Sequence, residues 1–391
     1  MKHERGTTNI RMDIFMTRVI YPVGFGTFCI ERFYQKDTNV VLFDMMYDCG
    51  SKSHMLGAIM SEAELLYEQK PLDLVCISHF DEDHINGFRK LIQTPAIQPD
   101  VTTILLPQIF DKDHLLEVLG VEEFVNYSNL RAELEERELK VIEVLPIEGE
   151  LHNQEREAID VHELKNPIES GTKISIIDHL WEYIPFNNFD RQRNIQLLDK
   201  LMALTNFDAQ KIIDIHNGNI SPDDIKKLKD AYQKLGKRKN NVSFINQNSL
   251  QVLSKENVYC SAHLHYSLGW IPSYMWVINP LVQYPFDPNT FAKESASCMY
   301  TGDSIMDQRI VEIQDKYAWG KHIGLFQIPH HGSTYCYDQG IMNQLNICAA
   351  FVNTTKGSVH LAPEILKWHQ NNISALFMVC AGNGGIYEYI Y

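Results

Sequence analysis

Short apolar runs separated by glycine-containing turns fill the first hundred residues of the chain. Their length and their content of β-branched and aromatic residues predict strands. These predicted strands lie at 19–33, 39–51, 72–78 and 101–107. Helices are predicted at 54–70 and from 85–93, between the last strands of this series. The alternation of strands and helices indicates a layered α/β fold.

The middle third of the chain has a different pattern. Residues 112–140 are acidic, with apolar positions at helical spacing, and residues 221–239 begin with a serine cap and a proline, as helices often do. Residues 172–186 have the character of strands. Because strand-like sequence resumes afterwards, we predict that 108–241 is a largely helical insertion within a single domain, 1–391.

A second set of strand-like runs occupies the last third of the chain. The runs lie at 242–254, 296–304, 322–333, 346–354 and 373–382. The first two are joined by a long connection, 255–295, that is rich in aromatic residues and prolines. Two hypotheses remain for this connection: a loop packed on the surface, or a wall over a site whose rings stack on a base.

Composition narrows the class of protein. The chain has 391 residues, of which 45% are hydrophobic and 22% charged, as in soluble globular proteins with a sizeable core. It has no apolar stretch of membrane-spanning length and no secretory signal pattern at its start. The eight cysteines are scattered, which predicts reduced thiols and a cytoplasmic protein without a membrane partner. A net charge of −15 argues against a large non-specific nucleic-acid surface.

Four groups of metal-binding residue types follow strand-like runs. They are His79, Asp81, Asp83 and His84; then Asp303; then His330 and His331; and finally His360. Burying such groups without a partner is strongly unfavourable, so they indicate a cation site. On an extended loop, alternate positions point the same way, and His79 and Asp81 are therefore able to share one metal. Asp83 and His84 can then turn toward a second ion, with Asp303 able to bridge the two.

In this order, the four groups resemble the motifs of the metallo-β-lactamase superfamily. The HxHxDH motif of that family appears here as HxDxDH, with Asp81 in place of its second histidine. Together with "TGD", "PHHGS", the opening "VGFGTFCIE…VVLFDMMYDCGS" and "NQNSLQVLS", the motif is most similar to the hydrolase domain of the DNA-uptake competence proteins (ComEC type). The resemblance covers about 20–105 and 242–391, and it implies an αββα sandwich.

The resemblance also implies a dinuclear centre and the residues that form it. The implied metal ligands are His79, Asp81, Asp83, His84, Asp303, His331 and His360, and the implied catalytic residues are Asp83, His330 and His331. Since neighbours on a strand end point to opposite sides, we expect one of the paired histidines to bind metal and the other to orient a ligand or the substrate. His360 has a second interpretation, as a histidine at the start of a helix.

One ligand of the first metal remains open. Many superfamily members supply a third histidine for it, and at the matching place this chain has Asn246, Asn248 and Ser249. The ligand is therefore one of His263, His265, Asn248 or water.

Two divalent ions, Mn²⁺ or Zn²⁺, are the expected cofactors. Asp81 adds a hard oxygen and shifts the preference toward Mn²⁺. A dinuclear site generates hydroxide at neutral pH and clamps the reacting group. The leading hypothesis is a phosphodiesterase acting on a nucleic acid or a nucleotide. The alternatives are a hydrolase of a lactone, thioester or amide, and a regulatory protein with a degenerate site.

Overall fold

The structure is a computed structural model. It describes residues 14–35, 38–53, 56–57, 60–61, 70–108, 121–147, 151, 157–188, 199, 202–208, 211, 221–224, 226–227, 230, 249–257, 266–271, 295–318, 323–355, 361–371, 375–380 and 385–390.

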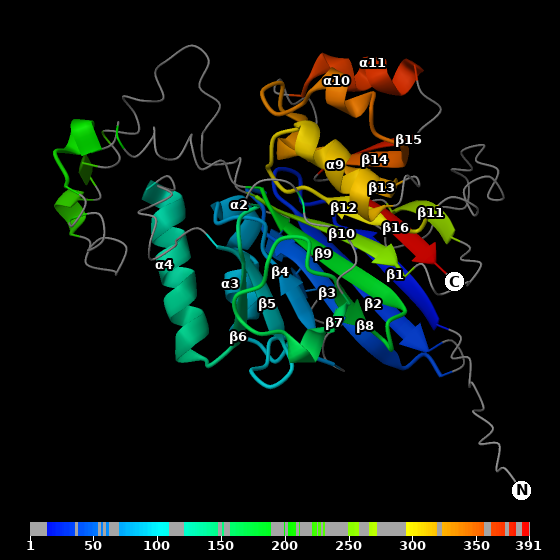
Figure 1. Cartoon of the computed structure of the whole chain (residues 1–391), viewed down its shortest axis with the longest axis horizontal. Helices are drawn as coiled ribbons and strands as arrows, with labels where there is room; N and C mark the ends of the chain where they lie inside the picture. Colours follow the sequence, from blue (N-terminus) through cyan, green and yellow to red (C-terminus); the bar gives the residue numbers. More distant parts are fainter. Residues whose placement is uncertain are drawn as a thin grey trace, which may run out of the picture.

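Two eight-stranded sheets form the centre of the described structure (Figure 1). The first contains, in spatial order, β11 (Tyr266–Ile271), β16 (Gly385–Ile390), β1 (Ile14–Ile20), β2 (Phe28–Gln35), β3 (Val41–Cys49), β4 (Leu74–Cys76), β5 (Thr103–Pro107) and β6 (Lys140–Val144). The second contains β15 (Ala375–Cys380), β14 (Ile347–Thr354), β13 (Ile323–Gln327), β12 (Cys298–Tyr300), β10 (Leu250–Glu256), β9 (Trp181–Asn187), β8 (Ile174–Ile176) and β7 (Ile159–Asp160). Strands β3 to β6 are parallel to one another, as are β12 to β15.

Helices cover the outer faces of both sheets. The first sheet carries α2 (Glu82–Ile85), α3 (Phe88–Leu91) and α4 (Val121–Glu136), and the second carries α9 (Gln308–Tyr317), α10 (Gln339–Met342) and α11 (Pro363–Asn371). Figure 1 shows α4 on one side of the molecule and α9, α10 and α11 together on the other. Short 3₁₀ turns occur at η1 (Val161–Glu163) and η3 (His330–Gly332).

Buried apolar side chains form three layers that correspond to this arrangement. Leu130 of α4 belongs to the same cluster as Ile104 of β5, outside the first sheet. A second cluster lies between the sheets and contains both Leu74 of β4 and Leu325 of β13. The third contains Ile310 of α9, Ile365 of α11 and Phe326 of β13. This order of helix, sheet, sheet and helix confirms the predicted αββα sandwich.

A buried ionic group joins the two sheets within the apolar layer. The Glu31 carboxylate on β2 accepts hydrogen bonds from Arg18 Nε at 2.7 Å, Tyr183 Oη at 2.8 Å, Ser254 Oγ at 2.7 Å and Tyr300 Oη at 2.8 Å. Arg18 and Glu31 lie on the first sheet, whereas the three hydroxyl donors lie on β9, β10 and β12 of the second. The charge of the carboxylate is therefore satisfied from both layers at once.

The middle third of the chain contributes to both sheets. Within 108–241 the described residues form α4, together with β6 of the first sheet and β7, β8 and β9 of the second. The strand predicted at 172–186 is present as β8 and β9. The helical share of the remaining positions and the single-domain boundary stay predictions, because many of these residues lie outside the described ranges.

The long connection 255–295 contains a strand that its sequence pattern does not predict. Residues Tyr266–Ile271 form β11, which pairs with the C-terminal strand β16 and extends the first sheet. Residues 258–265 and 272–294 lie outside the described ranges, so the hypothesis of a wall over the site stays open. Among the described helices, none is long and apolar enough to cross a membrane.

Candidate metal centre

The predicted ligands follow the carboxyl ends of strands from both sheets. The loop after β4 carries His79 to His84, the turn after β12 carries Asp303, and η3 after β13 carries His330 and His331. A backbone hydrogen bond of 2.7 Å from Leu250 N to Ser78 O ties the two sheets together at this edge. Groups far apart in the sequence thus meet where parallel strands end, as ligand sites in open α/β sheets commonly do.

Close backbone packing brings the loop after β3 against Asp83. A Cβ atom at Gly50 would lie 2.5 Å from the carbonyl oxygen of Asp83, and one at Gly26 would lie at the same 2.5 Å distance. Gly26 also has a φ of +133°, which L side chains rarely adopt. Only glycine fits at these two positions, and the loop is therefore able to touch the metal-ligand segment.

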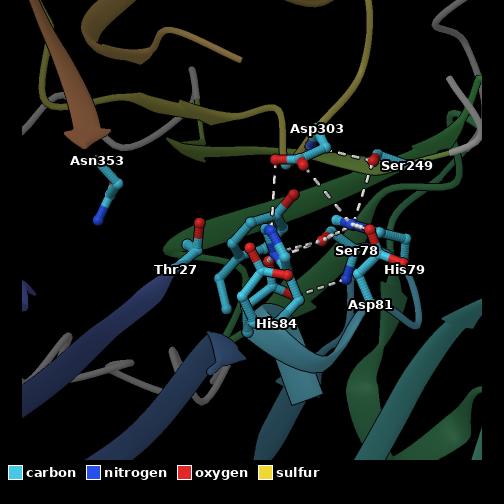
Figure 2. A network of polar contacts seen from close by, with 12 residues as sticks. Thr27, Ser78, His79, Asp81, His84, Ser249, Asp303 and Asn353 are labelled. Carbon is cyan, nitrogen blue, oxygen red and sulfur yellow. Dashed lines mark hydrogen bonds and ion pairs between the residues drawn. The ribbon is translucent and has the colours of Figure 1, made fainter. Parts of the chain in front are cut away.

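The Asp303 carboxylate occupies the centre of the site. Its Oδ1 atom lies 3.3 Å from His84 Nε2 and 3.8 Å from His331 Nε2. Its Oδ2 atom lies 3.8 Å from His79 Nε2 and 3.7 Å from His330 Nε2. In Figure 2 the imidazoles of His79 and His84 face this carboxylate. A carboxylate between imidazoles on both sides is suitably placed to bridge two cations.

Two overlapping groups of ligand atoms are compact enough to hold an ion. One contains His79, His84 and Asp303, and the other contains Asp83, His84 and His331; within each group the atoms lie within 4.8 Å of one another. His84 therefore belongs to both groups, whereas the sequence motif predicts that it binds the second metal alone. Asp81 lies beside the first group, with Oδ2 3.7 Å from His79 Nε2.

The outward-facing nitrogens of three histidines are fixed by hydrogen bonds. His84 Nδ1 lies 2.8 Å from Asp48 Oδ2, and His331 Nδ1 lies 3.0 Å from the Asn353 carbonyl oxygen. A carboxylate and a carbonyl only accept, so both rings donate through Nδ1. Ser78 Oγ donates to Asp48 at 2.7 Å and is left to accept from His79 Nδ1 at 2.9 Å. Each ring therefore directs Nε2 into the site, the arrangement that metal-ligating histidines generally adopt.

The inward-facing nitrogens of these three rings lack hydrogen-bond partners. Nε2 of His79, His84 and His331 is buried in each case and has no hydrogen bond. Buried polar atoms without partners are costly and uncommon in native proteins. Together with the carboxylates of Asp83 and Asp303, they form the mixed nitrogen and oxygen donor set that divalent transition-metal ions prefer. The residues at this site therefore fit a metal centre.

Electrostatics within the cluster separate the carboxyl groups from the imidazole of His84. Burial raises the pKa of Asp83, but the adjacent His331 and His84 outweigh it and hold the pKa below its usual value. The same competition, with His330 also contributing, holds the pKa of Asp303 well below its usual value. For His84, burial lowers the pKa, but Asp303 and Asp48 outweigh it and raise the pKa well above the ordinary value. These neighbours therefore favour the protonated form of His84 in the metal-free protein.

Both paired histidines face Asp303, and the alternation expected of a strand end does not hold here. His330 and His331 have φ values of 48° and 54°, so the backbone is in the left-handed region rather than extended. The tight turn η3 directs both Nε2 atoms to the same carboxylate. His330 Nδ1 contacts the Cys336 thiol at 2.8 Å, and burial lowers the pKa of His330.

Several of the residues named in the sequence analysis lie outside the described part of the chain. They are His360, His263, His265, Asn246 and Asn248. Their ligand roles stay predictions. Ser249 is described, and its Oγ accepts a 3.0 Å hydrogen bond from the backbone N–H of Asp303, so it supports the carboxylate from behind.

The structure adds supporting residues that the sequence analysis did not single out. Asp48 accepts hydrogen bonds from Ser78 N and Ser78 Oγ, each at 2.7 Å, as well as the contact with His84. Lys52 Nζ lies 2.9 Å from Asp83 Oδ2. A carboxylate at the end of the apolar run 39–51 was the available signal for Asp48, whereas a single lysine in a turn gives none.

Comparison with known proteins finds a family model that matches part of the chain. Residues 34–152 match the model of the metallo-beta-lactamase superfamily, and this range includes His79 to His84 but not Asp303. Among solved structures, the chain matches the crystal structure of the metallo-beta-lactamase fold protein YhfI from Bacillus subtilis. The match covers 95% of this chain and 98% of YhfI, with 10% sequence identity and a TM-score of 0.41. No curated protein matches the chain.

Proposed function

We propose that the protein is a metal-dependent hydrolase with a dinuclear centre and that it cleaves phosphodiester bonds in a nucleic acid or a nucleotide. The observation that carries the proposal is the convergence of three buried Nε2 atoms, none of which makes a hydrogen bond, on the carboxylates of Asp83 and Asp303. The superfamily match over residues 34–152 supports it, because this range contains three of the five residues in the two ligand groups, His79, Asp83 and His84.

The two ligand groups assign the residues that would hold the ions. His79 and Asp303 would contribute to one ion, Asp83 and His331 to the other, and His84, which has a single inward nitrogen, would bind only one of the two. Ions bound there would supply Lewis-acid chemistry, activating water and neutralising charge on the reacting group. Asp48, Ser78 and Ser249 do not face the reacting group; they fix the rings and the central carboxylate in place.

His330 has the geometry of a substrate-contacting residue. Its Nε2 faces Asp303 at 3.7 Å, and 23% of its side chain is exposed, against 11% or less for the other three rings that face this carboxylate. It therefore lies on the open side of the centre. Burial lowers its pKa, so the imidazole is neutral at pH 7 and is available to accept a hydrogen bond from substrate or water.

The donor chemistry favours a phosphodiester over a neutral ester. Asp81, Asp83 and Asp303 place three carboxylates around the ligand groups, and such oxygen-rich sites suit Mn²⁺ or Mg²⁺. Two divalent ions bound close together clamp the attacking and leaving oxygens of a phosphoryl group. No serine or cysteine nucleophile is needed for this chemistry.

Metal-stripped protein tests the proposal directly. It is titrated with Mn²⁺ and with Zn²⁺ and assayed on bis-p-nitrophenyl phosphate, single-stranded DNA, double-stranded DNA and a panel of lactones. We expect metal-dependent hydrolysis of the phosphodiesters, with the higher maximal rate in Mn²⁺ because Asp81 is a hard ligand. Asp160→Asn, at the end of strand β7 and remote in sequence from the site, is the control variant. Turnover of lactones alone would transfer the assignment to the non-phosphate hydrolases, and absence of metal binding would indicate a degenerate site.

A further inference from the structure

The side chain of Lys52 forms an ion pair with one carboxylate oxygen of the candidate metal centre. Lys52 Nζ lies 2.9 Å from Asp83 Oδ2, and its side chain is 65% exposed whereas that of Asp83 is only 3% exposed. The lysine therefore approaches the buried carboxylate from the solvent side. Asp81, with 34% of its side chain exposed, lies on the same open side of the cluster.

The backbone of this lysine is held firmly. Lys52 N donates to the carbonyl oxygen of Phe25 at 2.9 Å. Its neighbour Ser51 donates through Oγ to Val23 O at 2.5 Å, and the amide of Asn86 in the metal-ligand segment brackets Ser51 with bonds of 3.1 and 2.7 Å. The position of the Lys52 main chain is thus tied to the metal-ligand loop itself. Only the flexible stem of the side chain is free to move its charge.

The oxygen that Lys52 contacts is also one that a metal would use. Asp83 Oδ2 faces His331 Nε2 at 3.5 Å, and both residues belong to one compact ligand group. A divalent ion bound at this oxygen would repel the ammonium that lies beside it. Lys52 therefore partly balances the charge of Asp83 in the metal-free protein, and metal binding there weakens its contact with that carboxylate.

The charge balance of the centre indicates what kind of substrate the ammonium of Lys52 would bind. The carboxylates of Asp48, Asp81, Asp83 and Asp303 carry four negative charges when ionised, and they lie within or directly beside the centre. Two divalent ions would balance these four charges. The ammonium of Lys52, at the open side, then gives the site a net charge of +1. This charge attracts an anionic substrate and gives no advantage with a neutral one.

We propose that Lys52 is the anion-binding residue of this site and that its ammonium binds a non-bridging phosphate oxygen of the substrate after giving up Asp83. This inference rests on the proposed function and deepens it, because it selects an anionic phosphoryl substrate over a lactone or another neutral ester. Lys52 alternates between two partners of the same chemistry, a carboxylate oxygen and a phosphate oxygen, and both form charge-assisted hydrogen bonds.

The test compares Lys52→Met, Lys52→Arg and the control Lys165→Met, which removes another exposed lysine, from the loop between η1 and β8. Three measurements are made on each full-length protein. Calorimetry gives the Mn²⁺ affinity of the metal-stripped form and the affinity of the Mn²⁺-loaded form for inorganic phosphate. Steady-state kinetics on bis-p-nitrophenyl phosphate give kcat and KM.

For Lys52→Met we expect phosphate affinity to fall and KM to rise by about tenfold, with kcat changed less than about threefold. Its Mn²⁺ affinity should equal or exceed that of the wild type, since no ammonium competes for Asp83. Lys52→Arg should retain phosphate binding, and Lys165→Met should match the wild type throughout. A rise in the Mn²⁺ affinity of Lys52→Met would show that the ammonium competes with the metal. A lysine that only stabilises the loop would not give this rise.

Unchanged phosphate affinity in Lys52→Met would overturn the inference, and so would a loss of Mn²⁺ binding in that variant. Either result leaves the hydrolase assignment standing if the wild type still turns over the diester. Conversely, Lys52-dependent phosphate binding without hydrolysis of any ester would support the inference while contradicting the proposed function.

Discussion

The carboxylate of Asp48 and the imidazole of His84 form a fully buried pair, with Oδ2 2.8 Å from Nδ1. Asp48 comes from the end of β3 and His84 from α2, so the contact joins a strand of the first sheet to the helix α2. The same carboxylate holds Ser78, which in turn orients His79. One residue that faces no metal position therefore sets the direction of two rings that do.

From this relationship we predict that Asp48→Ala lowers Mn²⁺ affinity by about 10- to 100-fold, the usual effect of removing an outer partner of a ligating histidine. Asp48→Asn should give a smaller loss, because its amide oxygen still accepts from His84 and asparagine tolerates the φ of 51° found at this position. Calorimetric titration of metal-stripped protein with Mn²⁺ measures both effects.

Asp44→Asn is the matched control for that comparison. Asp44 lies on the same strand and is equally buried, but its carboxylate pairs with Arg32. Its substitution should lower the melting temperature without changing Mn²⁺ affinity in the protein that remains folded. Equal losses of Mn²⁺ affinity in the Asp44 and Asp48 variants would assign the effect to general destabilisation of β3.

Direct removal of a ligand gives a second prediction. Asp83→Ala and His84→Ala should each reduce metal-dependent hydrolysis by more than about 100-fold, beyond the loss expected for an outer residue. The sandwich should remain folded, since the clusters that hold the sheets together do not include either side chain. Circular dichroism verifies the fold, and wild-type turnover by either metal-loaded variant would refute the assignment of the site.

Much of this site could be predicted because its residues interrupt apolar runs. The strand predicted at 72–78 contains β4, and an apolar run that ends in His79, Asp81 and Asp83 has no stable explanation in a core. The strand predicted at 346–354 likewise contains β14. In both cases period and polarity change together, and a local pattern is sufficient to locate the end of the strand.

The features that escaped prediction depend on distant partners or on local backbone geometry. Strand β11 pairs with β16, which lies more than one hundred residues later in the chain. The local sequence of β11 does not predict this pairing. The common direction of His330 and His331 follows from their positive φ values, which the strand alternation rule does not cover. The contact between Lys52 and Asp83 depends on the close approach of Gly50 to Asp83, which the local sequence does not predict.

The raised pKa of His84 leads to a third prediction, about pH. Asp303 and Asp48 raise this pKa well above its ordinary value, so the proton stabilises the metal-free fold below about pH 6.5 and this contribution is lost as pH rises through the folded-state pKa. A metal must displace that proton. We therefore expect Mn²⁺ binding at pH 7 to release about one proton and to strengthen as pH increases.

Calorimetry in buffers of different ionisation enthalpy measures the proton release. The carboxyl groups of Asp83 and Asp303 contribute little to it, because their pKa values are held below the usual range and both are already ionised. The His84→Gln variant has no titrating proton at this position. It should therefore release markedly fewer protons for each Mn²⁺ ion that it still binds. Proton release that is the same in this variant and in the wild type would contradict the assignment to His84.

The buried Glu31 gives the last prediction, which concerns stability and not activity. Its carboxylate receives Arg18 from the first sheet and the hydroxyls of Tyr183 and Tyr300 from the second, all at 2.7 or 2.8 Å. Glu31→Ala removes a negative charge beside the buried Arg18 and the acceptor of the buried hydroxyl groups, so the free energy of unfolding should fall by roughly 3–5 kcal/mol. Tyr300→Phe, which deletes one hydroxyl, should cost about 1 kcal/mol. Urea denaturation measures both values, with Glu163→Ala on an exposed turn as the control; a loss below about 1 kcal/mol for Glu31→Ala would mean that this ionic group contributes little to holding the sheets together.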